Sequence, residues 1–250
     1  MSAALPSVAV RVVSLPGSAE RRASMAAQLD AVPSLDWAFF DALSALPAFL
    51  SHDASAARRV LARDLTQGEL GCFASHAALW REHAAAADHA VMVVLEDDVM
   101  IDPHFFARLA AFAARLPNAG LVRLYAKAPA PARIIGFVEG RHIVRYRGGA
   151  YGTQAYLLRP SAARVLARIT RIERPVDDVM DRFWEHGVPS LGIHPFPVLE
   201  IGFPSTIEAK RRTLPRPGTP GWLGWRGARA ADGLARRLAN LRYRISEPVL

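Results

Sequence analysis

The sequence predicts an α/β fold in which helices flank a mostly parallel sheet. Three observations support this prediction. The chain opens with segments that predict a strand, a helix and a second strand, which is the usual beginning of a parallel sheet. The run 91–95 is apolar at every position, as expected for a strand buried on both faces. Hydrophobic residues make up 51% of the 250 positions, which is enough for a substantial core and argues against disorder.

The opening unit is justified by its side-chain pattern. Residues 8–15 are rich in β-branched side chains and stop at Pro16-Gly17, which predicts a strand followed by a turn. Residues 18–32 begin with Ser18, a suitable N-cap, and place apolar side chains three and four positions apart, which predicts a helix. Residues 36–42 predict a short aromatic strand.

The next elements surround the apolar run. Residues 43–65 predict an irregular connection with a short helix. The TQGE sequence at 66–69 has the form of a capping box, so we expect a helix from there to about His83. Asp102-Pro103 predicts an N-cap followed by proline at the first helical position, and with it a helix over residues 104–116.

The second half of the chain predicts short strands, two helices and a basic tail. Expected strands cover residues 121–126, 133–138, 142–147 and 151–158, and expected helices cover 161–169 and 175–187, the last closed by Gly187. From about residue 210 onward the composition changes, and many arginines are interleaved with tryptophans and leucines. We therefore expect one α/β domain over residues 1–207 and a basic, tryptophan-containing tail over residues 208–250.

The composition narrows the class of protein. A net charge of +8 favours an anionic partner such as a nucleotide, a nucleic acid or a lipid headgroup. Cys72 is the only cysteine, so an intrachain disulfide or a cysteine-based metal cluster is excluded, which fits a reducing cytoplasm. No basic segment precedes the first apolar stretch, and no apolar run reaches about 18 residues, so we expect neither a signal peptide nor a membrane span.

Three adjacent carboxylates, Glu96, Asp97 and Asp98, follow the buried strand. Alternation along a strand would direct Glu96 and Asp98 to one side and Asp97 to the other. Open α/β sheets bind ligands at the carboxyl ends of their strands, and crowded, partly buried carboxylates need a cation or hydrogen-bond donors. A hard divalent ion, Mn²⁺ or Mg²⁺, shared with substrate phosphates would meet this need. The alternative is a solvated acidic turn before a helix.

A second acidic pair, Asp177-Asp178, begins the predicted helix after Pro175. These acids either compensate the helix dipole or include a general base that deprotonates an attacking hydroxyl. The spacing leaves both interpretations open. His194 similarly has two interpretations, as a further metal ligand or as a structural histidine.

The helix that starts with TQGE carries Gly71 and the pair Ser75-His76. Glycine early in a helix lowers its stability, so Gly71 indicates close approach by a backbone or ligand, or tight packing. A single histidine such as His76 is more typical of a structural role than of a catalytic one.

Taken in order, these segments resemble glycosyltransferase family 25, which includes bacterial lipopolysaccharide and lipooligosaccharide galactosyltransferases and the collagen galactosyltransferases. The resemblance covers roughly residues 8–207, and the combination between 65 and 106 is the most specific. The matching segments are VVSLPGSAERR, FFDA, LTQGELGCFASHAALW, VVLEDDVMIDPHF, YGTQAYLLRPSAARVL, PVDD and PFPVLEIGFPSTI.

The resemblance implies a GT-A fold, the Rossmann-like nucleotide-diphospho-sugar transferase domain, over residues 1–207. It implies a UDP-sugar donor, first of all UDP-galactose, and inversion at the anomeric carbon. It also implies a divalent metal, Mn²⁺ rather than Mg²⁺, and a saccharide acceptor in lipopolysaccharide or another cell-surface glycan.

The resemblance also implies roles for individual residues. Asp98 is the first choice as a metal ligand, with Glu96 beside it, and Asp177 or Asp178 would be the base. Expected contacts to the donor come from Leu15, Arg21, Gly71, Ser75, His76 and Asp97. An alternative for Arg21 is an exposed helix arginine.

The chain departs from the family pattern at two places. Ser14-Leu15-Pro16-Gly17 stands where the family usually has Asn-Leu-Asp-Arg, so we expect the donor contact of that turn to be lost or reshaped. Leu43-Ser44 stands where a glycine commonly follows the FDA-type segment.

The tail suggests a further partner. Its sequence GLARRLANLRYRI can form an amphipathic helix with Leu234, Leu238 and Leu241 on one face, next to a surplus of arginines. This composition favours an anionic lipid surface at the inner face of the cytoplasmic membrane, where a lipid-linked acceptor would be found. The alternative is a helix packed on the domain through its leucines.

Other classes of function are compatible with parts of the sequence. A metal-dependent phosphohydrolase or nucleotidyltransferase would use the same acidic cluster. Nucleic-acid binding is suggested only by the basic tail, and because no recognition motif accompanies it, we expect no nucleic-acid partner. A non-catalytic relative of the family is a further alternative, which the retained acidic motifs disfavour.

Overall fold

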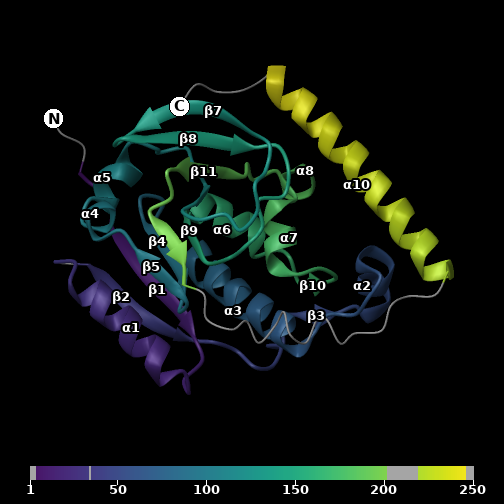
Figure 1. Ribbon diagram of the computed structural model, residues 1–250, viewed down its shortest axis with the longest axis horizontal. Helices are drawn as coiled ribbons and strands as arrows, with labels where there is room; N and C mark the ends of the chain where they lie inside the picture. Colours follow the sequence, from purple (N-terminus) through teal and green to yellow (C-terminus); the bar gives the residue numbers. More distant parts are fainter. Residues whose placement is uncertain (1–3, 34, 202–218, 246–250) are drawn as a thin grey trace.

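An eight-stranded mixed sheet forms the centre of the protein (Figure 1). The computed structural model describes residues 4–33, 35–201 and 219–245. The strand order is β2-β1-β4-β9-β6-β11-β8-β7. The strands are β1 (Val8–Ser14), β2 (Asp36–Asp41), β4 (Val91–Glu96), β6 (Leu121–Arg123), β7 (Ala132–Val138), β8 (Arg141–Tyr146), β9 (Ala155–Leu158) and β11 (Leu191–His194).

The strand directions confirm the α/β class and qualify the expectation of a mostly parallel sheet. Six strands point the same way, and β9 and β8 run against them, so that three neighbour pairings are parallel and four are antiparallel. Because β9 runs antiparallel to β4, the residues that precede β9 lie at the same edge of the sheet as the carboxyl end of β4.

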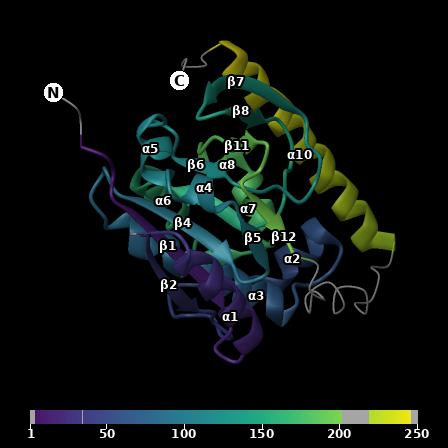
Figure 2. The same ribbon diagram turned by 60° about the vertical axis from the view of Figure 1, so that its left-hand side comes forward.

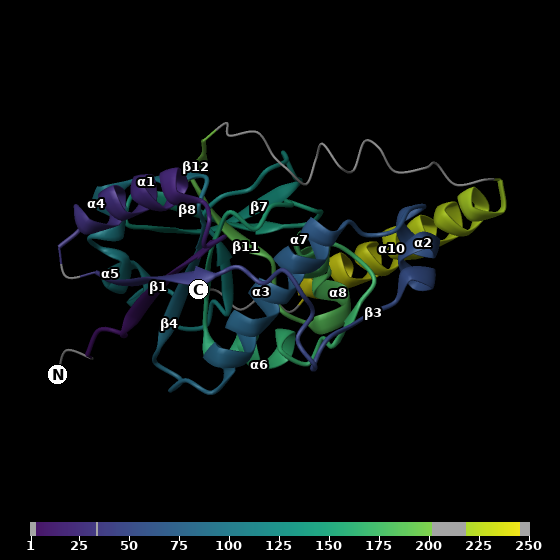
Figure 3. The same cartoon turned by 90° about the horizontal axis from the view of Figure 1, so that it is seen from below.

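Helices cover both faces of the sheet. On one face, Val93 belongs to a core that includes residues of α1, α4 and α5. On the other face, Val94 belongs to a core that includes residues of α3, α6 and α7. Figure 3 shows α1 and α4 on one side of the sheet and α6 on the other. These helices are α1 (Ala19–Asp30), α3 (Gln67–Ala84), α4 (Pro103–Phe106), α5 (Leu109–Ala114), α6 (Pro160–Leu166) and α7 (Val176–Asp181).

The expected helix starts are present. The Thr66 hydroxyl accepts from the Glu69 amide at 3.2 Å, and the Glu69 carboxylate accepts from the Thr66 amide at 2.8 Å, so the capping box is confirmed. The Asp102 carboxylate accepts from the amide of His104. Ser18 occupies the N-cap position of α1, but its side chain makes no capping hydrogen bond.

Two expected helices are interrupted, and one expected strand is shorter than predicted. The helix predicted over 104–116 divides at Arg108 into α4 and α5, and the one over 175–187 divides at Arg182 into α7 and α8 (Phe183–His186), because both residues leave helical dihedrals. The strand predicted over 151–158 begins only at Ala155. Tyr151 and Gly152 precede it with φ values of 51° and 84°, which end an extended conformation.

Short elements frame the main sheet. The residues after the acidic cluster form β5 (Val99–Ile101), which pairs antiparallel with β12 (Val198–Glu200). A second small sheet joins β3 (Ser51–His52) to β10 (Arg171–Ile172), next to α2 (Ala54–Leu61). These short strands were not expected from the sequence.

The tail contains a long helix, α10 (Thr219–Ile245), that is docked on the α/β body against α2 and α8 (Figure 2). Asp232 pairs with Arg174 at 2.9 Å and also with Arg182, and the ring of Tyr243 packs on Phe183 with centroids 5.8 Å apart. The helix therefore contacts the body through a mixed polar and aromatic face.

The leucines of α10 face away from that contact. Leu234, Leu238 and Leu241 are 59%, 58% and 54% exposed, so the alternative in which the helix packs on the domain through these leucines is wrong. The boundary expected between residues 207 and 208 lies outside the described residues. Among the helices of the described ranges, none has the length and apolarity that a bilayer crossing requires.

Candidate active site

The acidic cluster lies at the carboxyl edge of the parallel strands β1 and β4. Glu96 is the last residue of β4, and Asp97 and Asp98 form the turn into β5, so the alternation expected for three consecutive strand residues ends at Glu96. Ser14 ends β1 at the same edge, because Val13 is in register with Glu96. The residues after Asp98 form a strand rather than the helix of the alternative interpretation.

Asp97 is held by two partners from the first strand–helix unit. Its carboxylate accepts from the Ser14 hydroxyl at 2.6 Å and from the Arg21 guanidinium at 3.1 Å. Asp97 is buried and Arg21 half-buried, so Arg21 is not an exposed helix arginine. The turn that departs from the family pattern thus supplies Ser14, which fixes Asp97.

Asp98 carries a carboxylate that protein donors compensate only in part. Its Oδ2 lies 3.8 Å from the Arg21 guanidinium, and its buried Oδ1 has no hydrogen-bond partner among the described residues. Burial raises the pKa of Asp98 to about 7, with the charge of Glu96 adding to the effect and that of Arg21 opposing it. A buried carboxylate oxygen in this condition fits a bound cation, because a cation would supply the missing charge compensation.

Glu200, in β12, is a neighbour that sequence reasoning missed. Pairing of β12 with β5 places Glu200 opposite Val99, and its charge also raises the pKa of Asp98. Its carboxylate accepts from Tyr125 at 3.2 Å and from Lys127 at 3.1 Å. A three-residue strand has too few positions for a periodic signal, and although the segment PFPVLEIGFPSTI contains this glutamate, the family resemblance assigned it no role.

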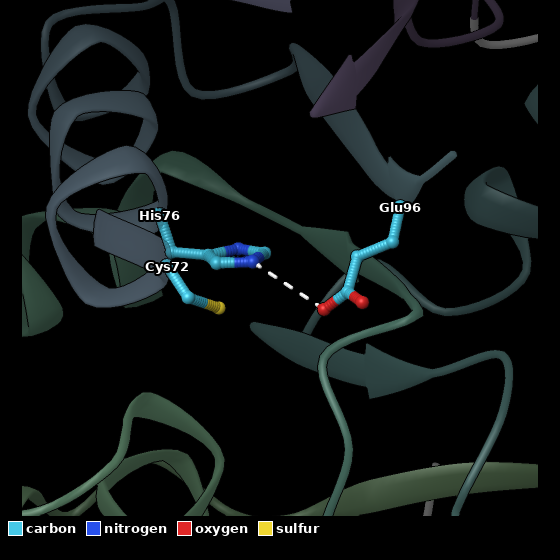
Figure 4. A group of neighbouring side chains, drawn as sticks. All are labelled: Cys72, His76 and Glu96. Atoms are coloured by element: carbon cyan, nitrogen blue, oxygen red, sulfur yellow. Dashed lines mark ion pairs between the residues drawn. The ribbon is translucent and has the colours of Figure 1, made fainter. Parts of the chain in front are cut away.

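Glu96 faces a different set of partners from Asp97. Its carboxylate accepts a hydrogen bond from the Thr153 hydroxyl and lies 3.8 Å from Nε2 of His76, on α3 (Figure 4). His76 Nδ1 is 2.9 Å from the Tyr156 hydroxyl. The expected pair of metal ligands, Glu96 and Asp98, is therefore close in sequence but divided between two polar environments.

Gly71 and Ser75 contact the segment after β2. A side chain at Gly71 would place its Cβ 2.5 Å from the carbonyl oxygen of Leu43, so this glycine permits close packing of two backbones. The Ser75 hydroxyl donates to the Gly71 carbonyl and accepts from the Leu43 amide, both at 2.8 Å. Leu15 is 54% exposed, and its carbonyl accepts from Arg22 at 3.2 Å.

Asp177 and Asp178 begin α7, as expected. Asp177 accepts from the Gly152 amide at 3.3 Å, and Asp178 pairs with Arg174 at 3.1 Å. Burial raises the pKa of Asp178, although the charges of Arg174 and Arg182 oppose the shift. Asp178 is half-buried, which is compatible with both interpretations of the pair, helix-dipole compensation and a general base.

A third acid of α7, Asp181, forms the most buried ion pair at this site. It lies 2.8 Å from Arg123, and both side chains are almost fully buried. Its second oxygen accepts from the Tyr151 amide at 2.8 Å. The Arg123–Asp181 pair holds the 151–153 loop against α7 and so fixes the position of this loop relative to the helix.

The 151–153 loop connects the acidic cluster after β4 with the acidic pair of α7. Gly152 binds Asp177 through its amide, and the next residue, Thr153, binds Glu96 through its hydroxyl. Consecutive Cα atoms are about 3.8 Å apart, so the two groups approach the same short segment. The sequence-predicted residues Glu96, Asp177 and Asp178 are therefore brought together around this loop.

A charged cavity of about 400 Å³ opens beside Asp177 and Asp178. Its walls come from α2, α7, α8 and α10, and they include the aromatic rings of Tyr151, Trp184 and Trp225. Glu96, Asp97 and Asp98 do not line it. His194 does not line this cavity either; its Nε2 lies 3.2 Å from the Tyr146 hydroxyl and its ring packs against Phe196.

The segments that build this site also match a family model. The model described as "Glycosyltransferase family 25 (LPS biosynthesis protein)" matches residues 9–180, which is more than half of the chain. The chain belongs to glycosyltransferase family 25. The matched range includes the acidic cluster and Asp177-Asp178, whereas Glu200 and α10 lie beyond it.

Curated relatives in family 25 match about half of the chain. A human protein named "Inactive glycosyltransferase 25 family member 3" is 36% identical over 124 residues, which are 47% of this chain and 20% of the human protein. An Aedes aegypti protein named "Glycosyltransferase 25 family member" is 31% identical over 121 residues, 46% of this chain and 20% of that protein. This chain spans about a fifth of the length of these relatives.

Two crystal structures show a more distant likeness to this family 25 chain. The alignment with an active-site mutant of LgtC includes 88% of this chain and 99% of the LgtC chain, with a TM-score of 0.41 and 10% sequence identity. The alignment with a glycosyltransferase involved in glycosylation of the major capsid of PBCV-1 includes 72% of this chain and 69% of that chain, with a TM-score of 0.32 and 10% sequence identity.

Proposed function

We propose that this chain is an inverting glycosyltransferase with a GT-A type fold, which transfers a hexose, first of all galactose, from a UDP-sugar to a saccharide acceptor. The observation that carries the proposal is the buried Asp98 oxygen, which has no donor within the described part of the chain and lies at the strand edge where a nucleotide would bind. Membership of family 25 supports sugar transfer. The description of the family model as a lipopolysaccharide biosynthesis protein supports an acceptor in lipopolysaccharide or another cell-surface glycan.

The donor diphosphate would bind at the edge formed by Ser14, Asp97 and Asp98. Asp98 would be the main protein ligand of a divalent ion, Mn²⁺ rather than Mg²⁺, and Glu96 or Glu200 would be the neighbouring carboxylate. When bound, such an ion stabilises the negative charge on the departing diphosphate. Arg21, positioned by Asp97, supplies positive charge at the same edge.

Asp177 or Asp178 would accept the proton of the attacking hydroxyl. The acceptor oxygen forms its bond to the anomeric carbon as the bond from that carbon to the diphosphate oxygen breaks on the opposite face. UDP leaves with the electron pair of the broken bond, and the acceptor proton passes to the carboxylate. Asp178 suits this role because burial raises its pKa, and a carboxylate of higher pKa is a stronger base.

The acceptor would enter through the cavity that Trp184 and Trp225 line together with the two acids. Aromatic rings offer flat apolar surfaces against which a sugar ring packs, and several arginines in the same walls suit an anionic saccharide. Trp225 belongs to α10, so the tail helix would form part of the acceptor site.

The opposite face of α10 would contact an anionic membrane surface. Leu234, Leu238 and Leu241 are exposed there, and the exposed Arg237 is interleaved with them. Apolar residues next to arginines suit the interface of a bilayer with anionic lipids. The enzyme would then act in the cytoplasm, peripherally on the inner face of the cytoplasmic membrane.

A panel of nucleotide sugars tests the donor assignment. We expect a UDP-hexose, with UDP-galactose first, to raise the melting temperature of the protein in Mn²⁺, and the Asp98→Asn variant to lose this Mn²⁺-dependent shift. Transfer of the sugar is then measured by mass spectrometry of a saccharide acceptor. Release of phosphate or pyrophosphate without transfer would instead favour a phosphohydrolase or nucleotidyltransferase, and binding without any turnover would favour a non-catalytic relative.

A further inference from the structure

Three side chains with different donor atoms converge between α3 and the end of β4. Cys72 and His76 are one helical turn apart on α3, and Glu96 faces them from β4 (Figure 4). One ligand atom from each side chain lies within 4.8 Å of the other two. Gly71, Ser75 and the packing of α3 hold both helix residues in place, so the arrangement is supported by surrounding structure.

His76 is the informative member of this group. Its side chain is fully buried, and its Nε2 has no hydrogen-bond partner among the described residues. The distance of 3.8 Å from Nε2 to Glu96 Oε1 is too long for a hydrogen bond. A buried ring nitrogen without a partner is unfavourable, and here it faces the Glu96 carboxylate.

The other side of the imidazole is oriented as in a metal-binding histidine. Nδ1 is 2.9 Å from the Tyr156 hydroxyl, which also accepts from the Trp80 indole at 3.0 Å. When Nδ1 donates to Tyr156, Nε2 presents its lone pair toward Glu96. Histidines that bind metals commonly fix their orientation through such a hydrogen bond from the second nitrogen.

The donor set selects the class of ion. Thiolate, imidazole and carboxylate together are typical ligands of Zn²⁺, whereas Mn²⁺ and Mg²⁺ prefer oxygen donors alone. Bond lengths in zinc sites place neighbouring ligand atoms about 3.4 to 3.7 Å apart, so a small inward movement of these side chains would complete the geometry. Thr153 donates to Glu96 and lies 4.0 Å from the Cys72 sulfur, so its hydroxyl borders the site and connects two of the three ligands.

We propose that Cys72, His76 and Glu96 bind a borderline divalent cation of the zinc class. This site is distinct from the hard-cation site at Asp98, although Glu96 adjoins both. It does not depend on sugar transfer, because its ligands follow from the α3–β4 packing alone.

Cobalt spectroscopy tests the site directly in the 250-residue chain. Co²⁺ substitutes for Zn²⁺ and gives a thiolate-to-cobalt charge-transfer absorption, and because Cys72 is the only cysteine, that absorption can come from no other residue. We expect one equivalent of Co²⁺ to produce the band, Zn²⁺ to abolish it and excess Mg²⁺ to leave it unchanged. Absence of the band at saturating Co²⁺ would refute the proposal.

Two variants complete the test. Cys72→Ser keeps the shape of the side chain and should remove the band and lower Zn²⁺ affinity by at least about 10-fold, with an unchanged far-ultraviolet circular dichroism spectrum. His52→Asn is the matched control, since His52 pairs with Asp64 at 2.8 Å without a nearby thiol, and it should leave the band intact. Equal Zn²⁺-dependent increases in melting temperature for the wild type and Cys72→Ser would also overturn the site, because ligand stabilisation follows affinity.

Discussion

Glu96 and Asp177, which come from different elements, are both bound by one short loop: Thr153 donates to the first and Gly152 to the second. This loop precedes β9, the strand that runs antiparallel between β4 and β6. The reversed direction of β9 brings the loop to the carboxyl edge of β4. The conformation of Gly152 therefore controls the distance between Glu96, at the proposed donor site, and Asp177, at the proposed acceptor site.

Gly152→Ala tests this dependence. Gly152 has a φ of 84°, and an added Cβ would meet Gln154 and would lie 3.1 Å from the Cβ of Lys127. We expect a loss of about 1 to 3 kcal/mol in the free energy of unfolding and a loss of transfer activity in excess of the unfolded fraction, measured by denaturation and by initial rates.

Gly140→Ala is the matched control for Gly152→Ala. Gly140 has a φ of 77°, but open space surrounds it, so this variant carries the backbone strain without the collision. We expect it to lower stability by about 1 kcal/mol and to leave the transfer rate of the folded protein unchanged. Equal effects of both substitutions on the rate would contradict a role for the loop.

Asp97→Asn and Asp98→Asn should separate two roles within the acidic turn. Asp97 is hydrogen-bonded to Ser14 and Arg21, so its replacement should lower the free energy of unfolding by about 1 to 3 kcal/mol. Asp98 has a buried oxygen with no hydrogen-bond partner in the described ranges, so its replacement should preserve stability without metal and remove Mn²⁺-dependent binding of UDP. Calorimetry of both variants checks this, and loss of stability in Asp98→Asn would show that the carboxylate is structural.

The sequence predicted the site's parts better than their arrangement. The apolar strand, the capping box at Thr66 and the acids of α7 were expected because each has a local pattern. The pairing of Glu96 with Thr153 was not, because it depends on the direction of β9, which a strand's own side chains do not specify. Glu200 escaped prediction for a similar reason, since only the pairing of β12 with β5 brings it near Asp98.

The proposal that Asp177 or Asp178 is the base can be tested by comparing the three acids of α7. We expect Asp177→Asn or Asp178→Asn to lower kcat by about 100-fold or more, with little change in donor affinity. Asp181→Asn is the structural comparison, because it breaks the buried pair with Arg123 and should lower stability by about 3 kcal/mol. Rates measured on folded protein, with donor affinity determined separately, distinguish the cases; normal kcat in both the first two variants would exclude these acids as the base.

Docking of α10 should depend on pH through Asp232. Burial opposes ionisation of this carboxylate, but the hydrogen bonds and charges of Arg182 and Arg174 outweigh burial and lower its pKa below the ordinary 3.8. A lowered folded-state pKa stabilises the docked helix at neutral pH, and this contribution is lost as the pH falls below about 3.8. The protection of residues 219–245 against hydrogen exchange, corrected for the intrinsic rate at each pH, should fall in that range, and Asp232→Asn should show the lower protection already at neutral pH.

The two faces of α10 should have separable functions. Trp225 lines the cavity beside Asp177, so Trp225→Ala should raise the KM for the saccharide acceptor by about 3- to 10-fold without changing lipid binding. Replacing Leu234, Leu238 and Leu241 by serine should abolish flotation with vesicles that contain anionic lipid and leave the acceptor KM unchanged, since these side chains point away from the body. Steady-state kinetics and vesicle flotation on both variants decide the assignment. If the leucine variant still floats, the exposed face is not a membrane contact, and if Trp225→Ala leaves KM unchanged, the helix does not contribute to acceptor binding.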